Sequence, residues 1–172
     1  DILRNSDTPA VHNPQSNMNN AVGVAPVMQM LSKGVLVGLG TDGMTSNMRD
    51  EVRVANLLHK LAARDPRVFF AESCNLLLGN NARIAGRFFP RPLGVLAAGA
   101  YADIILLDYD PPTPLDGGTF LGHFLFGLCG ARVRTTIVNG RVLMRDGEVL
   151  SVDEEKVAAK SRALAKAFWR RF

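Results

Sequence analysis

The spacing of hydrophobic residues changes near Phe88 and divides the chain into two parts. In the first part, residues 10–13 are typical of the end of a strand, and apolar residues between 24 and 31 recur at helical spacing. Gly34 ends that helix, and the apolar run 35–40 follows. A run that is apolar on both faces is typical of a buried parallel strand, which needs neighbours on each side. The first part therefore predicts a parallel β-α-β-α unit.

A second helix is predicted after the strand at 35–40. Asn47 stands three residues before Asp50, in the arrangement of a helix N-cap. An apolar stripe follows, and Asp65-Pro66 ends it. The stripe consists of Val52, Ala55, Leu58 and Ala62. We expect shorter helices between residues 71 and 86.

The second part has the pattern of short strands joined by tight turns. Residues 93–108 indicate two strands around a glycine turn. The pairs Asn139-Gly140 and Asp146-Gly147 are strong hairpin signals, because both turn residues can adopt positive φ. Residues 151–154 form a capping box, and an amphipathic helix follows with its apolar residues at helical spacing. These observations predict a small antiparallel sheet and a C-terminal helix that packs on another surface.

Charge changes this picture little. The net charge is +4, and residues 152–172, with six basic and three acidic side chains, carry +3 of it. Acidic residues early and basic residues late in a helix complement its dipole, so no nucleic-acid partner is expected. No run reaches the roughly 18 apolar residues of a membrane span, so we expect no membrane partner and a cytoplasmic location. Cys74 and Cys129 lie far apart in sequence and are expected to be reduced thiols.

Asp42 is the strongest candidate for chemistry in the first part. It follows the apolar strand directly and lies between Gly40 and Gly43, which let a ligand approach the backbone closely. Carboxylates at the end of a parallel strand are catalytic in many β/α barrels. An aspartate that turns the chain or caps the next helix explains the same pattern equally well. The sequence around Asp42 alone therefore does not distinguish a catalytic carboxylate from a turn or cap residue.

Two motifs resemble the seventh and eighth barrel strands of the amidohydrolase superfamily, in its deaminase and chlorohydrolase branch. They are VHNPQSN at residues 11–17 and GLGTDG at residues 38–43. Downstream, LGVLAAGAYADIILLD at 93–108 and TIVNG at 136–140 resemble the C-terminal β-sandwich segment of that family. GMTSNM at 43–48 and HFLFG at 123–127 resemble a subgroup of aminohydrolases linked to purine breakdown. The resemblance covers nearly the whole chain.

The resemblance implies a fold of class α/β. Residues 1–88 would be the last strands and helices of a metal-dependent (β/α)8 barrel, residues 89–150 a small antiparallel β-sandwich segment, and residues 151–172 the C-terminal amphipathic helix. It also implies a hydrolase that uses one divalent metal ion, zinc or iron. The enzyme would act on C–N or C–Cl bonds of a cyclic, nitrogen-rich small molecule, and deamination by activated water is the favoured reaction.

For Asp42 the resemblance implies two roles, as a metal ligand and as the group that takes the proton of the attacking water. His12 and Asn17 are assigned to orienting the metal ligands or ordering the loop. For His12, a purely structural role, in which the ring only satisfies its own hydrogen bonds, is an equal alternative. Thr45 and Ser46 follow in the loop, where they either touch substrate or form a polar turn. His59 lies inside the predicted helix, which favours a structural role.

The chain departs from the family in lacking a His-X-His pair and a glutamate placed as the proton donor. One aspartate cannot hold a metal that needs about three protein ligands. With its start at Asp1, this indicates the C-terminal portion of a longer protein, inactive alone, with no tightly bound metal. We expect the chain alone to self-associate through an open second edge of the strand at 35–40. The sequence does not determine whether the complete protein forms a homo-oligomer. The alternative to an enzyme fragment is a non-catalytic remnant that acts as a binding or assembly module.

Overall fold

The computed structural model describes residues 1–172, and its chain forms two compact units. The α/β unit comprises Asp1–Ala100 and Tyr109–Ala131, and the hairpin unit comprises Tyr101–Asp108 and Arg132–Phe172. The elements of the α/β unit are α1 (Ile2–Asn5), β1 (Ala10–His12), α2 (Pro14–Asn19), α3 (Val27–Ser32), β2 (Val37–Leu39), α4 (Met48–Ala63), α5 (Phe70–Asn75), the π-helix η1 (Leu76–Asn80), α6 (Asn81–Ala85), α7 (Phe120–Phe126) and the 3-10 helix η2 (Leu128–Gly130).

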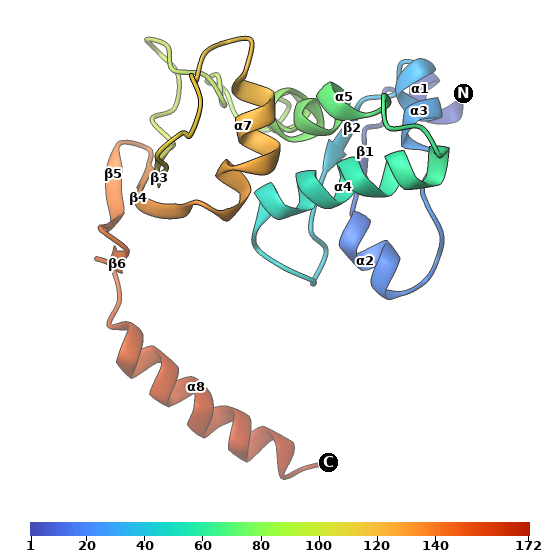
Figure 1. The fold of residues 1–172 in the computed structure, drawn as a ribbon. Coiled ribbons are helices and arrows are strands. Elements are labelled where there is room, and N and C mark those ends of the chain that lie inside the picture. Colours follow the sequence, from blue (N-terminus) through green and yellow to red (C-terminus); the bar gives the residue numbers. More distant parts are fainter. The chain divides into compact units, whose positions relative to one another are not determined.

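Strands β1 and β2 pair in parallel, with Ala10 opposite Val37 and His12 opposite Leu39 (Figure 1). This confirms the parallel pairing that the sequence indicates. Strand β2 covers only three residues of the apolar run 35–40, and all three are buried. The connection between the strands contains α3, and Gly34 follows that helix with a φ of 77°. Glycine adopts this conformation at no steric cost, which is why the helix stops there.

The second edge of β2 is covered by side chains and not by another strand. The Asn80 side chain donates from Nδ2 to the carbonyl of Val37 over 2.7 Å. Asn81 donates from Nδ2 to the carbonyl of Leu39 over 2.8 Å, and its Oδ1 accepts from the Leu39 amide over 2.9 Å. These amides satisfy backbone groups that would otherwise be left without partners. The expectation of an open edge on this strand is therefore wrong.

Helix α4 begins where the sequence predicts. The Asn47 side chain accepts a hydrogen bond from the Asp50 amide, which confirms the N-cap, and Arg64 ends the helix with a φ of 54°. The buried face differs from the predicted apolar stripe. It consists of Glu51, Val52, Ala55, Asn56 and His59. Three of these five residues are polar, so helical spacing of apolar residues alone could not identify the whole face.

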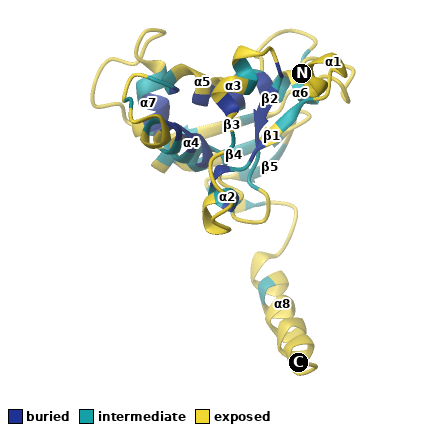
Figure 2. Ribbon diagram, turned by 90° about the vertical axis from the view of Figure 1, so that its right-hand side faces the viewer, coloured by how far each residue is buried: buried dark blue, intermediate teal, exposed yellow.

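The buried residues of the chain lie in the α/β unit (Figure 2). The buried hydrophobic side chains are Val27, Val35, Val37, Leu39, Val52, Ala55, Phe69, Cys74, Leu76, Phe124, Leu125 and Leu128. They come from β2, α4, the segments on either side of them and the α7–η2 region, so residues far apart in sequence form one core. Cys74 and Cys129 are free thiols.

The hairpin unit contains an antiparallel sheet in the order β3-β4-β5-β6. Its strands are β3 (Ile104–Asp108), β4 (Arg132–Val138), β5 (Arg141–Arg145) and β6 (Glu148–Val149). The turns at Asn139-Gly140 and Asp146-Gly147 have positive φ at both residues, which confirms the two hairpin signals. Of the two strands expected within 93–108, only β3 forms. Gly94 has a φ of 73°, which is incompatible with a strand at that position, whereas Gly99, with a φ of 84°, lies in the glycine turn that the sequence indicates.

Helix α8 (Glu154–Trp169) follows the sheet in sequence. Its N-cap is Asp153, whose side chain accepts from the Lys156 amide over 3.0 Å, so the helix starts two residues later than a cap at Ser151 would place it. None of its residues is buried. None of the helices has the length and apolar character that crossing a membrane requires.

Candidate functional site

The carboxyl ends of β1 and β2 lie at the same edge of the parallel pair. Helix α2 begins two residues after His12, and the loop 40–47 begins directly after Leu39. The amide of Gly40 donates to the carbonyl of His12 over 2.9 Å, so the pairing continues into the start of the loop. Parallel pairing therefore brings α2 and this loop together, although 26 residues separate Ser16 from Asp42. We refer to Ser16, Asp42 and Gly43 as the strand-end site.

Asp42 is exposed, and both of its carboxylate oxygens have protein donors. The Ser16 hydroxyl donates to Oδ2 over 2.7 Å, and the Gly43 amide donates to Oδ1 over 2.8 Å. The backbone of Asp42 is in the left-handed region, with a φ of 50°. Aspartate tolerates this conformation better than most residues, because its short side chain can bond locally. The result is a solvent-accessible carboxylate whose orientation the protein fixes.

His12 lies at the end of β1 and is buried. Its Nε2 is 3.2 Å from Nε2 of His59 on α4, and its Nδ1 is without a hydrogen-bond partner. Burial, with a smaller contribution from the charge of His59, lowers the pKa of His12 to about 4. Burial also lowers the pKa of His59. Both rings are therefore neutral at neutral pH. In the hydrogen bond between them, one Nε2 carries the proton and donates, and the other Nε2 is unprotonated and accepts.

The remaining sequence candidates lie around the strand-end site without contacting the Asp42 carboxylate. Asn17 is part of α2, and its backbone amide donates to the carbonyl of Asn13 over 3.0 Å. The Thr45 hydroxyl accepts from the Asn47 amide over 3.0 Å and so orders the loop just before α4. Ser46 is exposed. The structure thus brings these residues to one region, and their roles toward a substrate stay predictions.

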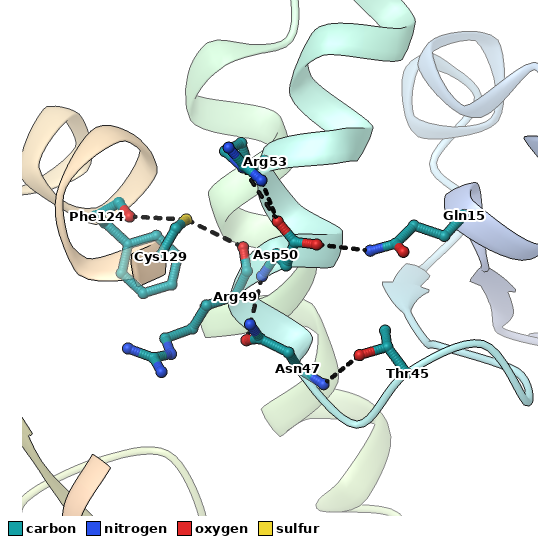
Figure 3. Close-up of polar contacts among 8 residues, drawn as sticks. All are labelled: Gln15, Thr45, Asn47, Arg49, Asp50, Arg53, Phe124 and Cys129. Carbon is teal, nitrogen blue, oxygen red and sulfur yellow. Dashed lines mark hydrogen bonds and ion pairs between the residues drawn. The ribbon is translucent and has the colours of Figure 1, made fainter. Parts of the chain in front are cut away.

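Polar contacts fix the start of α4 from two sides (Figure 3). The Asp50 carboxylate accepts from Gln15 Nε2 over 3.1 Å and from Arg53 Nη2 over 2.6 Å. The Cys129 thiol lies 3.2 Å from the carbonyl oxygens of Arg49 and Phe124. Helix α4 is therefore tied to α2 and to the α7–η2 region, and the loop that carries Asp42 is held at both ends.

Sequence reasoning missed two polar residues near this region. Ser16 contacts Asp42 directly, and its position inside the motif VHNPQSN was the available signal. Glu51 on α4 is fully buried. Its Oε2 accepts from the Gln15 amide over 3.3 Å and its Oε1 has no partner. Burial raises the pKa of this carboxyl. Nothing in the sequence distinguishes Glu51 from an exposed glutamate in the first turn of a helix.

The chain does not contain a complete metal site. No group of three or more histidine, cysteine, aspartate or glutamate side chains in residues 1–172 is arranged to hold an ion. Asp42 offers one accessible oxygen ligand of the type that divalent cations accept. The residues present therefore fit one ligand of such a site and do not fit the whole of it.

Comparison with known proteins gives consistent matches. The model of the amidohydrolase family matches residues 2–143. A 5'-deoxyadenosine deaminase from Methanosarcina acetivorans is 39% identical over 171 residues, which cover 96% of this chain and 39% of the relative. A 5-methylthioadenosine/S-adenosylhomocysteine deaminase from Desulforudis audaxviator is 39% identical over 170 residues, with the same coverage. The chain thus spans about two fifths of the length of these relatives.

Two solved structures share the fold of this chain over part of their length. An adenosine deaminase from Xanthomonas campestris with bound zinc superposes with a TM-score of 0.79 at 24% identity, over 96% of this chain and 38% of that one. An atrazine chlorohydrolase from Arthrobacter aurescens, complexed with zinc, has a TM-score of 0.72 at 26% identity, over 91% of this chain and 35% of that one. In both, the matched part is a minority of the longer chain.

Proposed function

Because this chain belongs to the amidohydrolase family, we propose that it is the C-terminal part of a metal-dependent (β/α)8-barrel hydrolase that deaminates a cyclic, nitrogen-rich substrate. One observation carries the proposal. The carboxylate of Asp42 lies at the shared carboxyl end of two parallel strands, exposed and oriented by two donors. That is the edge at which β/α barrels place their catalytic groups. The hairpin unit corresponds to part of the β-sandwich segment in this proposal.

Asp42 has two proposed roles. It is one oxygen ligand of a single zinc or iron ion in the complete protein, and it takes the proton from the water that attacks the C–N carbon. A bound divalent ion lowers the pKa of a water molecule to about 7. The Asp42 carboxylate can then hold that proton and pass it toward the departing ammonia, which is the work of a positioned acid/base group. The other metal ligands and the proton donor are proposed to lie in an N-terminal portion.

The other candidate residues support Asp42 in this proposal. His12 and Asn17 order the segment that follows β1, and His12 does so as a neutral ring paired with His59. Thr45 and Ser46 belong to the loop that would face substrate, and Thr45 additionally holds the loop against the start of α4. These assignments are supported by the positions of the residues around one strand end.

The names of the relatives support a proposal for the substrate class. Two of the most similar relatives are named as deaminases of 5'-deoxyadenosine and of 5-methylthioadenosine or S-adenosylhomocysteine. We propose an adenosine derivative, whose exocyclic amino group leaves as ammonia. Hydrolysis of a C–Cl bond is the second candidate, because an atrazine chlorohydrolase shares the fold. In both reactions a hydroxyl group from water replaces the leaving group on a nitrogen heterocycle, and the second proton of the water leaves with ammonia or with chloride.

The test uses the full-length protein that carries this chain, purified with zinc or with iron. Adenosine, 5'-deoxyadenosine and 5-methylthioadenosine are supplied separately, and ammonia release is followed together with the change in adenine absorbance. We expect turnover of at least one of them and a loss of about a hundredfold or more in Asp42→Asn, because an amide cannot accept the proton of water. Near-normal activity of this variant would make Asp42 a turn residue and refute the mechanism.

A further inference from the structure

We propose that Ser16 is the positioning residue of the strand-end site: its hydroxyl holds the Asp42 carboxylate in the orientation that the reaction uses. This inference rests on the proposed function of Asp42. The Ser16 Oγ to Asp42 Oδ2 distance of 2.7 Å is that of a well-formed hydrogen bond from a hydroxyl to an oxygen acceptor, and such a bond is stronger when the acceptor is a carboxylate than when it is a neutral group.

Ser16 differs from Asp42 in its exposure to water. Only 5% of Ser16 is exposed, so water does not compete with the carboxylate for the hydroxyl proton. Asn20, one turn later, donates from Nδ2 to the Ser16 oxygen over 3.4 Å and occupies one of its lone-pair directions. The hydroxyl therefore directs its proton toward Asp42, and the donor is fixed before any substrate arrives. Such preorganisation places a reacting group without further loss of entropy.

The remaining constraints on Asp42 leave this role to Ser16. The Gly43 amide bonds the other oxygen, Oδ1, and belongs to the same turn as Asp42, so it moves with the loop. Ser16 belongs to α2, which follows β1 in the sequence, and its bond therefore connects the carboxylate to a different segment of the α/β unit. Each carboxylate oxygen accepts one of these bonds and keeps further acceptor capacity. The carboxylate is thereby oriented while it stays able to accept a proton.

A role in folding alone predicts a different result from substitution. In Ser16→Ala no buried donor is left unpaired, because the donor itself is removed, and Oδ2 of the exposed Asp42 can accept from water. The stability cost of such a change is small. A displaced carboxylate, in contrast, lowers the rate of the chemical step, since misplacement by about 1 Å can cost a hundredfold.

The experiment compares Ser16→Ala, Ser16→Thr and the wild type in the full-length protein, with 5'-deoxyadenosine as substrate. We expect kcat of Ser16→Ala to fall between about tenfold and a hundredfold, with KM and the thermal midpoint nearly unchanged, and Ser16→Thr to recover most of the loss. Ser32→Ala is the matched control. Its hydroxyl donates to the carbonyl of Gln29 at the exposed end of α3, so this variant should keep wild-type kinetics.

A double-mutant cycle separates this proposal from the proposed function. If Ser16 acts through Asp42, Ser16→Ala causes no further loss in an Asp42→Asn background. Wild-type activity of Asp42→Asn refutes the proposed function, whereas an inactive Asp42→Asn with an unimpaired Ser16→Ala refutes only the positioning role. A crystal structure of Ser16→Ala adds a readout that needs no substrate: we expect Asp42 in more than one rotamer, and a single unchanged rotamer would overturn the proposal.

Discussion

The α/β unit and the hairpin unit fix their residues by different means. In the α/β unit, buried side chains from distant segments meet, and polar groups such as His12, His59 and Asn80 lie among them. In the hairpin unit, no residue of the four strands or of α8 is buried, and the sheet depends on backbone pairing and on two turns with positive φ. Turn chemistry close in sequence therefore defines one unit, and contacts distant in sequence define the other.

This difference matters for the proposed chemistry. The strand-end site needs a fixed carboxylate, and of the two bonds that fix it the one from Ser16 joins residues distant in sequence, whereas the one from Gly43 is local. Core contacts make a region costly to open locally, whereas exposed hairpins open at low free energy. A catalytic group placed at the edge of the α/β unit therefore keeps its geometry better than one placed on the hairpins. Substitutions in the two units test this contrast.

We expect the largest loss of stability from Asn81→Ala. The variant removes the two bonds between the Asn81 side chain and the backbone of Leu39, a residue that is 3% exposed. Each unpaired buried group costs about 1–3 kcal/mol, so the loss of both bonds should lower the free energy of unfolding by roughly 2–6 kcal/mol. Urea denaturation measures the change, and hydrogen exchange locates it at residues 35–42.

Asn19→Ala is the matched control for Asn81→Ala. The Asn19 side chain is exposed and bonds only weakly to Asn20, at 3.5 Å, so this variant should stay within about 0.5 kcal/mol of the wild type. Equal effects of the two substitutions would show that the Asn81 amide does not replace a strand at the β2 edge.

The paired histidines predict a pH dependence of the α/β unit. The pKa of His12 is lowered from 6.5 to about 4 in the folded chain, so the unfolded chain binds the proton first as pH falls. The stability contributed by the neutral ring is complete above pH 6.5 and is lost as pH falls toward 4. By pH 5 the loss is about 2 kcal/mol. Urea denaturation at pH 7.5 and pH 5 should show it, and in His12→Asn the difference should shrink. An unchanged difference in that variant would assign the effect to other groups.

The sequence predicted those features whose cause lies within a few residues. The N-cap at Asn47 and the hairpins at Asn139-Gly140 and Asp146-Gly147 are of this kind, and so is the position of Asp42 after a buried strand. The cover of the β2 edge was not predictable, because Asn81 lies 42 residues from Leu39. An asparagine in a helix carries no sign that its amide will bond a strand.

Two local predictions failed for a different reason: the sequence offered competing signals. Residues 93–98 have apolar residues suited to a strand, but Gly94 adopts a positive φ that a strand does not allow. At the start of α8, Ser151 and Asp153 both suit an N-cap, and the capping-box pattern favoured the wrong one. Of the strand-end site, Asp42 was predictable from its place after a buried strand. The role of Ser16 was not, because the predicted pairing of β1 and β2 does not determine which side chain of α2 meets the Asp42 carboxylate.

The N-cap of α8 gives a smaller effect that decides between those two residues. Asp153→Ala removes the acceptor for the Lys156 amide and should cost about 1 kcal/mol of helix stability. Ser151→Ala should cost nothing, and Asp153→Ser should restore most of the loss because serine is also a good cap. Hydrogen exchange of residues 154–160 measures the effect. A loss in Ser151→Ala and none in Asp153→Ala would place the cap where the sequence pattern placed it.

We expect the smallest effect from Arg134→Ala. Arg134 and Asp146 form an ion pair at 2.6 Å between side chains that are 59% and 63% exposed, and this contact lowers the pKa of Asp146. Exposed pairs of this kind often contribute nothing measurable, because water and salt screen them and the long side chain loses freedom. Thermal unfolding of the variant should therefore match the wild type at low and at high salt.

Gly147→Ala is the informative contrast to Arg134→Ala. The φ of 85° at Gly147 is unfavourable for alanine, so the turn should open and hydrogen exchange in β5 and β6 should accelerate. If Arg134→Ala destabilised the sheet as much as Gly147→Ala did, the hairpin unit would depend on side-chain contacts after all, and its contrast with the α/β unit would be lost.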